Sequence, residues 1–448
     1  MKIWYLIFCV GFSVSAASVF SLSDSDPDSP AFKKRFLASY GVNGAIEPKL
    51  ASKDQSLYQK VLPLLSSAPR DAIAIVQREV NPNSNAAFDF LVGNLFYQLR
   101  DFGQAERAMK EAVRKFPSFR RAYRILALIY VQRDELKRAI EPLLRVIELG
   151  GGDGQAYGLL GYAYLVGEKY ESGLAAYRMA RMFEPDSLDF RRGQAHCLLE
   201  TDQNKLAIAL FDELIVEFPS ETDFWLLQAN AFLAAGEKEK VIANLELVGD
   251  RKQGTWSTYI LLGDLYLSDD LVQLALASYL QALDQDPASG GELLIRPLKA
   301  LVERRHFAVG KRYLASMRKV ANSKISPAQQ TEIDLAEAKI EAKIGDPALA
   351  LSLLKKSLST DPLNGEVLLT LGDHYFGTEM FDDAERYYEL ALSVPEVKVE
   401  ALVSLGRLAV SRGSFSTAVS HLRQAQEIHP RPNVARYLEA VERRVKTR

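Results

Sequence analysis

Apolar side chains recur every three or four positions through most of this chain, which is the spacing of one buried stripe along an α-helix. Residues 256–287 illustrate the pattern, because two amphipathic helices fit there with a short turn at residues 267–270 between them. Pro287 then ends the second helix, since proline has no N–H to donate and clashes with the preceding turn. The pattern therefore predicts helices that follow one another in pairs.

The predicted helix pairs repeat with a period of 34 residues. Pro185 and Pro219 stand one period apart, and so do Gly372 and Gly406. The same offsets recur inside well-preserved copies, with Gly263, Tyr266, Ala275, Tyr279 and Ala282 in one and Gly372, Tyr375, Ala384, Tyr388 and Ala391 in another. We expect the small residues where two helices cross closely and the aromatic residues between neighbouring copies. A fixed period of this length indicates one supersecondary unit copied along the chain.

These residues resemble the tetratricopeptide repeat, whose pattern is a large apolar residue, Leu-Gly, Tyr, Ala, an aromatic residue, Ala and Pro. One copy reads Tyr157, Leu160, Gly161, Tyr164, Tyr177, Ala180 and Pro185. Only Gly173 departs from the pattern, since the family prefers Ala there. The resemblance covers about residues 86–430 and implies an all-α fold, a right-handed α-solenoid of antiparallel helix pairs.

We predict about ten repeats, and three of them are worn. Their starts are expected near residues 86, 120, 154, 188, 222, 256, 290, 331, 365 and 399. The copies at 222, 290 and 331 are degenerate; in the second of these, Pro297 falls where glycine or alanine belongs. The register slips by seven residues before Pro362, and the stretch 319–330 is the predicted site of the slip and of a break between two sub-arrays.

The two ends of the chain differ from the repeats. Residues 1–17 are predicted to be a signal peptide, because Lys2 precedes an apolar run and Val14-Ser15-Ala16 offers small residues for cleavage before Ala17. An uncleaved anchor remains the alternative. Residues 18–50 are interpreted as a flexible linker, 51–84 as a degenerate helical pair, 85–430 as the array and 431–448 as a capping helix.

Composition and the scarcity of reactive clusters argue against catalysis. The net charge of −2, with 48% hydrophobic and 25% charged residues, is ordinary for a soluble protein and does not favour nucleic acid. Export would leave Cys197 as the sole cysteine, and the five histidines are spread over four repeats. The glycine cluster at 150–154 is interpreted as a helix-ending turn. We therefore predict no enzyme activity, no cofactor and no metal site.

The remaining candidate for function is a surface. The resemblance implies that the first helix of each repeat lines the concave face, where protein or peptide partners bind. Arginine and aromatic residues suit such recognition, although packing in the core is an alternative for several of them. The predicted groove residues are Phe90, Asn94, Tyr97, Arg121, Arg124, Tyr162, Arg192, His196 and Asn230.

The resemblance also bears on the kind of partner. Some family members hold a chaperone's C-terminal carboxylate with paired Lys and Asn residues, but here Phe90 and Ile125 occupy two of the required positions. We therefore predict a non-enzymatic, exported, periplasmic or secreted scaffold that binds a protein or peptide, within a cell-envelope complex. The alternative is an accessory subunit of a periplasmic transport, energy-transduction or polysaccharide-export machine.

Overall fold

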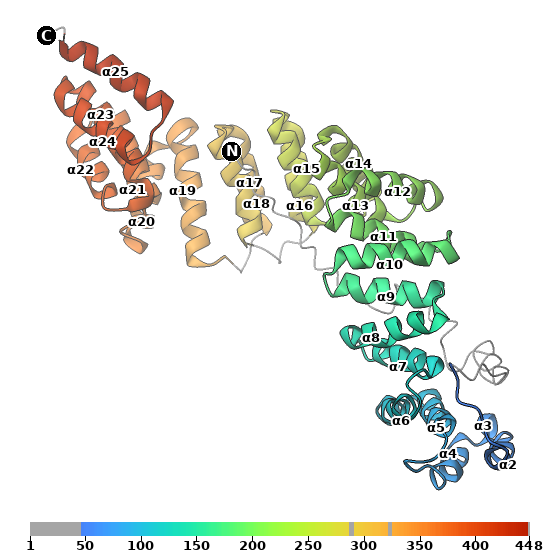
Figure 1. Cartoon of the computed structure of the whole chain (residues 1–448). Helices are drawn as coiled ribbons and strands as arrows, with labels where there is room; N and C mark the ends of the chain where they lie inside the picture. The colour runs from blue at the N-terminus through green and yellow to red at the C-terminus, as the bar shows by residue number, and fades with distance from the viewer. Residues whose placement is uncertain (1–45, 286–290, 321–324, 447–448) are drawn as a thin grey trace. The chain divides into compact units, whose positions relative to one another are not determined.

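The computed structural model describes residues 46–285, 291–320 and 325–446, and every regular element in these ranges is a helix (Figure 1). The predicted signal peptide, most of the predicted linker and part of the predicted register slip lie outside the described residues. The chain divides into two compact parts, unit 1 up to Glu237 and unit 2 from Lys238. The division falls inside the worn repeat that begins at residue 222, whereas the sequence predicted a break near 319–330.

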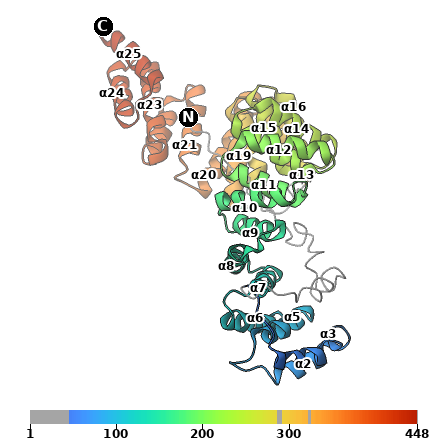
Figure 2. The same cartoon turned by 45° about the vertical axis from the view of Figure 1, so that its right-hand side comes forward.

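The described part of unit 1 starts with three short helices and continues with regular pairs. The short helices are α2 (Ser52–Val61), α3 (Leu64–Ser67) and α4 (Pro69–Gln77). The regular helices are α5 (Ala86–Gln98), α6 (Phe102–Lys115), α7 (Arg120–Gln132), α8 (Leu136–Val146), α9 (Gly154–Val166), α10 (Tyr170–Phe183), α11 (Leu188–Glu200), α12 (Asn204–Glu217) and α13 (Thr222–Ala235). Each packs against the next from α4 to α13, and both views show this stacked order (Figures 1 and 2).

Unit 2 has the same organisation and ends in a single helix. Its helices are α14 (Lys238–Asp250), α15 (Trp256–Ser268), α16 (Val272–Gln285), α17 (Gly291–Glu303), α18 (Phe307–Val320), α19 (Pro327–Ile344), α20 (Pro347–Thr360), α21 (Gly365–Gly377), α22 (Phe381–Ala391), α23 (Lys398–Ser411), α24 (Phe415–Ile428) and α25 (Pro432–Lys446). The predicted all-α solenoid of consecutive helix pairs is confirmed, and its handedness stays a prediction.

The first helices of the repeats begin close to the predicted starts, and the largest difference is at α19. That helix begins at Pro327, four residues before the predicted position 331, and is 18 residues long. Ser326 caps it, because its side chain accepts a hydrogen bond from the Gln329 N–H while Gln329 reciprocates. Proline at the first helical position costs no hydrogen bond, so this Ser-Pro pair begins the helix early.

Glycine lies at the close helix crossings, as the repeat pattern predicted, and there it interlocks with a tyrosine of the same repeat. A Cβ atom on Gly263 would lie 2.3 Å from the Tyr279 ring, and one on Gly372 would lie 2.4 Å from the Tyr388 ring. Both tyrosines are buried. Any side chain at these two positions would clash with the tyrosine ring, because protein interiors are close-packed.

The buried tyrosine hydroxyls find partners in some repeats and not in others. Tyr279 donates to Asp264 at 2.8 Å, and Tyr388 donates to Asp373 at 2.7 Å. In the repeat that begins at 154, the position equivalent to these aspartates holds Tyr162, and the buried hydroxyl of Tyr177 has no hydrogen-bond partner among the described residues. Burial raises the pKa of the Tyr177 hydroxyl, which stays protonated.

Candidate partner-binding surface

The nine predicted groove residues all belong to first helices of unit 1, but the structure buries four of them. The exposed fractions of Phe90, Asn94, Tyr97 and Tyr162 are 1%, 0%, 0% and 6%. The Phe90 ring lies 4.9 Å from the Phe119 ring, centroid to centroid, inside the hydrophobic core. These side chains therefore offer almost no surface to a partner in this structure, and the packing alternative describes them.

Arg121 is engaged by a segment that precedes the helices. Its Nε donates to Glu47 Oε2 at 2.8 Å, and its guanidinium carbon lies 5.3 Å from the centre of the Phe90 ring. The exposed fraction of the Arg121 side chain is 21%, against 9% for Glu47. The pair is therefore largely shielded from water, which strengthens the attraction between the two charges.

Arg124 forms hydrogen bonds to the glycine turn that follows α8. It donates to the Gly151 carbonyl at 2.9 Å and to Asp153 Oδ2 at 2.7 Å. Gly150 adopts a φ of 74°, the left-handed conformation that commonly ends a helix. The cluster at 150–154 is thus the predicted helix-ending turn, and Arg124 satisfies its acceptors rather than pointing freely to solvent.

The remaining three predicted residues do present surface, on α11 and α13. The Arg192 side chain is 28% exposed, lies 5.1 Å above the Phe224 ring and has Glu221 3.7 Å away. His196 is partly exposed, with its Nε2 atom 3.6 Å from Glu200, and Asn230 is exposed. Burial lowers the pKa of His196, so its imidazole is neutral at pH 7. We call Arg192, His196 and Asn230 the α11–α13 surface.

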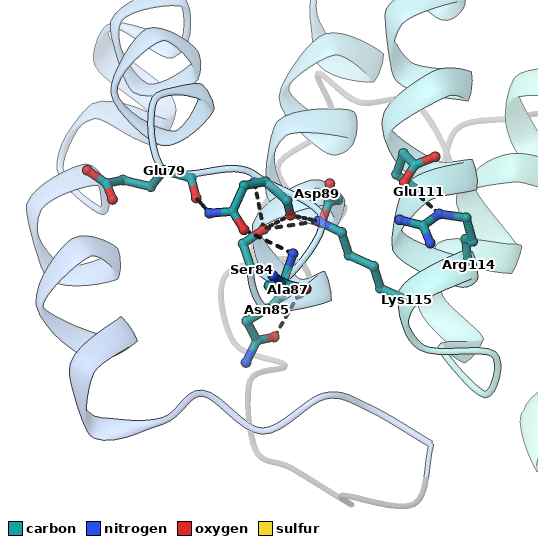
Figure 3. Close-up of polar contacts among 10 residues, drawn as sticks. Glu79, Ser84, Asn85, Ala87, Asp89, Glu111, Arg114 and Lys115 are labelled. Carbon is teal, nitrogen blue, oxygen red and sulfur yellow. Dashed lines mark hydrogen bonds and ion pairs between the residues drawn. The ribbon is translucent and has the colours of Figure 1, made fainter.

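Sequence reasoning missed a buried ion pair at the start of the array (Figure 3). Lys115, at the end of α6, reaches back to Asp89 in α5 with a distance of 2.6 Å between Nζ and Oδ2. The same ammonium group donates to the Asn81 carbonyl at 2.7 Å and to the Ser84 hydroxyl at 3.0 Å. Burial raises the pKa of Asp89, and the hydrogen bond from Lys115 opposes that shift. All three donor positions of the lysine are used, so this cluster fixes the turn before α5.

The segment Ile46–Leu50, which we call the arm, crosses the beginnings of α5 and α7. The Arg120 N–H donates to the Ile46 carbonyl at 3.3 Å, and the Asn85 side chain donates to the Lys49 carbonyl at 2.7 Å. Glu47 and Pro48 are buried. In these five residues of the stretch predicted as a flexible linker, Arg121 holds the Glu47 carboxylate and Leu50 packs against the hydrophobic core.

The described residues hold no group of three or more His, Cys, Asp or Glu side chains placed to bind a metal ion. None of the helices among them has the length and apolar character needed to cross a membrane. The thiol of Cys197 is buried, and this burial raises its pKa to about 12, so it stays protonated at neutral pH.

Comparison with known proteins agrees with the repeat structure. One tetratricopeptide repeat family model matches residues 91–154, 159–222 and 192–240, and a second matches 342–396. Human Superkiller complex protein 3 is 25% identical over 206 residues, which span 44% of this chain and 13% of that protein. Human DnaJ homolog subfamily C member 3 is 24% identical over 226 residues, spanning 47% of this chain and 44% of that protein. The chain thus matches less than half the length of either relative.

Solved structures with a similar chain course include PilW, described as a widely conserved type IV pilus biogenesis factor. It is 20% identical, with a TM-score of 0.37, and the alignment covers 48% of this chain and 97% of PilW. The 34-residue period, the interlocked glycine and tyrosine residues and the two matching family models converge on one family. This chain belongs to the tetratricopeptide repeat family.

Proposed function

We propose that this protein is a non-enzymatic, exported scaffold that binds a protein or peptide partner on the face formed by its first helices, within a cell-envelope complex. Its repeat fold supports a protein-interaction role. The export part of the proposal is motivated by the signal-like residues 1–17, with the apolar run and small residues before Ala17.

The α11–α13 surface carries this proposal. His196 and Asn230 are one 34-residue period apart, so neighbouring first helices present polar groups at equivalent positions. Arg192 lies over the Phe224 ring, which holds the guanidinium in place while leaving part of it accessible. Side chains that are partly ordered before binding lose less entropy when a partner arrives.

Nothing among the described groups favours a chemical step over binding. The protonated Cys197 thiol is a poor nucleophile, and His196 contacts Glu200 on its own helix. The buried tyrosine hydroxyls donate to aspartates where they are paired, which stabilises the core. We therefore assign these groups to structure and recognition.

Quantitative recovery of partners tests the proposal. We expect the double variant Arg192→Ala/Asn230→Ala to recover at least tenfold less of a specific partner from the native host than the wild type. Arg178→Ala is the matched control, because Arg178 is exposed on the second helix α10. Equal recovery by the double variant and the wild type would contradict the surface assignment. Arg121 and Arg124 are unsuitable for this test, because both hold internal contacts.

Export has its own test. The mature protein should be found outside the cytoplasm, with its N-terminus at Ala17 by mass spectrometry. A chain that keeps residues 1–16 and remains in the cytoplasm would refute the export proposal while leaving the scaffold role intact.

A further inference from the structure

The arm has the form of a bound peptide. Ile46 and Glu47 lie in a turn, residues 48–50 follow without helical structure, and Figure 1 shows this stretch running from beside α7 towards α2. Its main chain is held at two carbonyls, Ile46 by the Arg120 N–H and Lys49 by the Asn85 side chain. The Arg120 N–H lies in the first turn of α7, where backbone N–H groups have no partner inside the helix, and the other donor is the side-chain amide of Asn85, the residue before α5.

One acidic side chain provides the specific contact of the arm. The Glu47 carboxylate is buried and lies 2.8 Å from Arg121, whose guanidinium also lies over the Phe90 ring. The beginning of α7 adds a favourable partial positive charge for an anion nearby. The site therefore selects an extended main chain that carries one carboxylate.

The arm satisfies this site incompletely. Glu47 Oε1 is buried without a hydrogen-bond partner among the described residues, which costs free energy because the oxygen has lost its water. Among the described residues, the polar anchors of the arm are two main-chain hydrogen bonds and one ion pair. A ligand that pairs both carboxylate oxygens would compete well for the same groups.

From these contacts we propose that Arg121, Asn85 and the beginning of α7 form a binding site for an extended acidic peptide of the partner, and that the arm is its built-in competitor. The inference rests on the proposed function and adds the chemistry of the ligand. The arm and the ligand cannot occupy the site together. A change that lowers the fraction of chains with a docked arm should therefore raise the apparent affinity for the ligand by the same factor as it raises the fraction with a free site.

Trypsin cleavage after Lys49 reports release of the arm in the full-length protein. The Lys49 side chain is exposed, but the Lys49 carbonyl accepts the hydrogen bond from Asn85. While the arm is docked, its main chain therefore cannot enter the active site of trypsin. We expect Glu47→Gln to raise the rate of this cleavage at least fivefold. A rate within twofold of the wild type would overturn the proposal.

Peptide binding tests the site itself. The probe is a fluorescein-labelled, capped hexapeptide with the sequence of residues 46–51, measured by anisotropy against full-length chains. We expect Glu47→Gln to bind it at least fivefold more tightly than the wild type, and Glu47→Gln/Arg121→Gln to lose that gain. A probe with Gln in place of its Glu should bind no chain. Equal binding by the single and double variants, or by the two probes, would overturn the proposal.

Two controls separate a lost site from a lost fold. Both are made in the Glu47→Gln background. There Arg121→Lys keeps the charge and should retain part of the gain in binding, whereas Arg114→Gln removes an exposed arginine that pairs with Glu111 and should leave the gain unchanged. Circular dichroism melts of all variants identify any chain that unfolds. If the arm assays fail while partner recovery still depends on Arg192 and Asn230, only the acidic-peptide inference is lost.

Discussion

The repeat that contains α15 and the worn repeat that contains α19 build the same helix pair in different ways. In α15, Gly263 leaves room for the Tyr279 ring, and Asp264 accepts a hydrogen bond from the Tyr279 hydroxyl. In α19, three acidic residues are buried instead, with exposed fractions of 3%, 7% and 6% for Asp334, Glu337 and Glu341.

Each buried acid of α19 pairs with a cation from a neighbouring helix. Lys356 of α20 lies 2.9 Å from Asp334, Arg318 of α18 donates to Glu337 at 2.7 Å, and Lys311 of α18 lies 2.7 Å from Glu341. The cations are about half exposed and reach inward from the surface. A helical-repeat crossing can therefore be held by shape or by charge, and the contribution from charge should depend on pH and salt.

The largest expected loss of stability comes from disturbing the packing of glycine against tyrosine. Gly372→Ala should destabilise unit 2 by about 2 kcal/mol, because the new methyl group overlaps the Tyr388 ring and overpacking costs about 1–3 kcal/mol. Gly377→Ala is the matched control on the same helix, since a Cβ there meets no atom within 4 Å. Urea denaturation of both variants measures the difference. Equal stability of the two would contradict the interlock.

Charge at α19 gives the next effect. Lys311→Met should destabilise the chain by about 1–2 kcal/mol, less than for a fully buried pair, because Lys311 is 49% exposed and solvent screens it. The loss should shrink in 1 M salt, unlike that of Gly372→Ala. Denaturation at two salt concentrations checks this, and a salt-independent loss would mean that the side chain stabilises by packing alone.

The α19 region should also respond to acid. Hydrogen bonds from Lys311 and from the Asp346 N–H lower the pKa of Glu341 below its usual value of 4.5. A carboxyl whose folded pKa is depressed contributes stability above its unfolded pKa and loses it as pH falls through the folded pKa. Glu341→Gln should therefore flatten the fall in stability below about pH 4.5. An unchanged pH profile would contradict this role.

Tyrosine hydroxyls offer a smaller comparison within the standard repeats. Tyr279→Phe should cost about 1 kcal/mol, because Asp264 loses a hydrogen bond. Tyr177→Phe should be neutral or slightly stabilising, because its buried hydroxyl has no hydrogen-bond partner among the described residues. Thermal melts of the two single variants compare their stabilities. A larger loss of stability in Tyr177→Phe than in Tyr279→Phe would show that the Tyr177 hydroxyl makes a hydrogen bond.

The smallest effect should be shared by standard and worn repeats. Glu168 and Arg305 both occupy left-handed turn positions, with φ of 57° and 65°. Glycine adopts this conformation without the Cβ penalty, so Glu168→Gly and Arg305→Gly should each stabilise by up to about 1 kcal/mol. Denaturant midpoints check both variants. If the two variants change the free energy of unfolding in opposite directions, the worn repeat that contains Arg305 has a different turn from the standard repeat that contains Glu168.

The sequence predicted the helix pairs well because periodic apolar residues and prolines are local signals. It did not predict the acids of α19 as interior residues, since a charged residue in a helix is usually solvent-exposed and its partners come from other helices. The sequence left the burial of Phe90 open and missed the docking of Glu47 for a related reason. Both depend on contacts between residues far apart in the chain, which no period reveals.

Site-specific crosslinking in the native host tests the scaffold proposal most directly. A photoreactive amino acid at Asn230 should yield a discrete adduct with a partner protein. The same group at Val216, which is 84% exposed on the second helix α12, should yield none. An adduct at position 216 and none at 230 would contradict the claim that partners bind on the first helices.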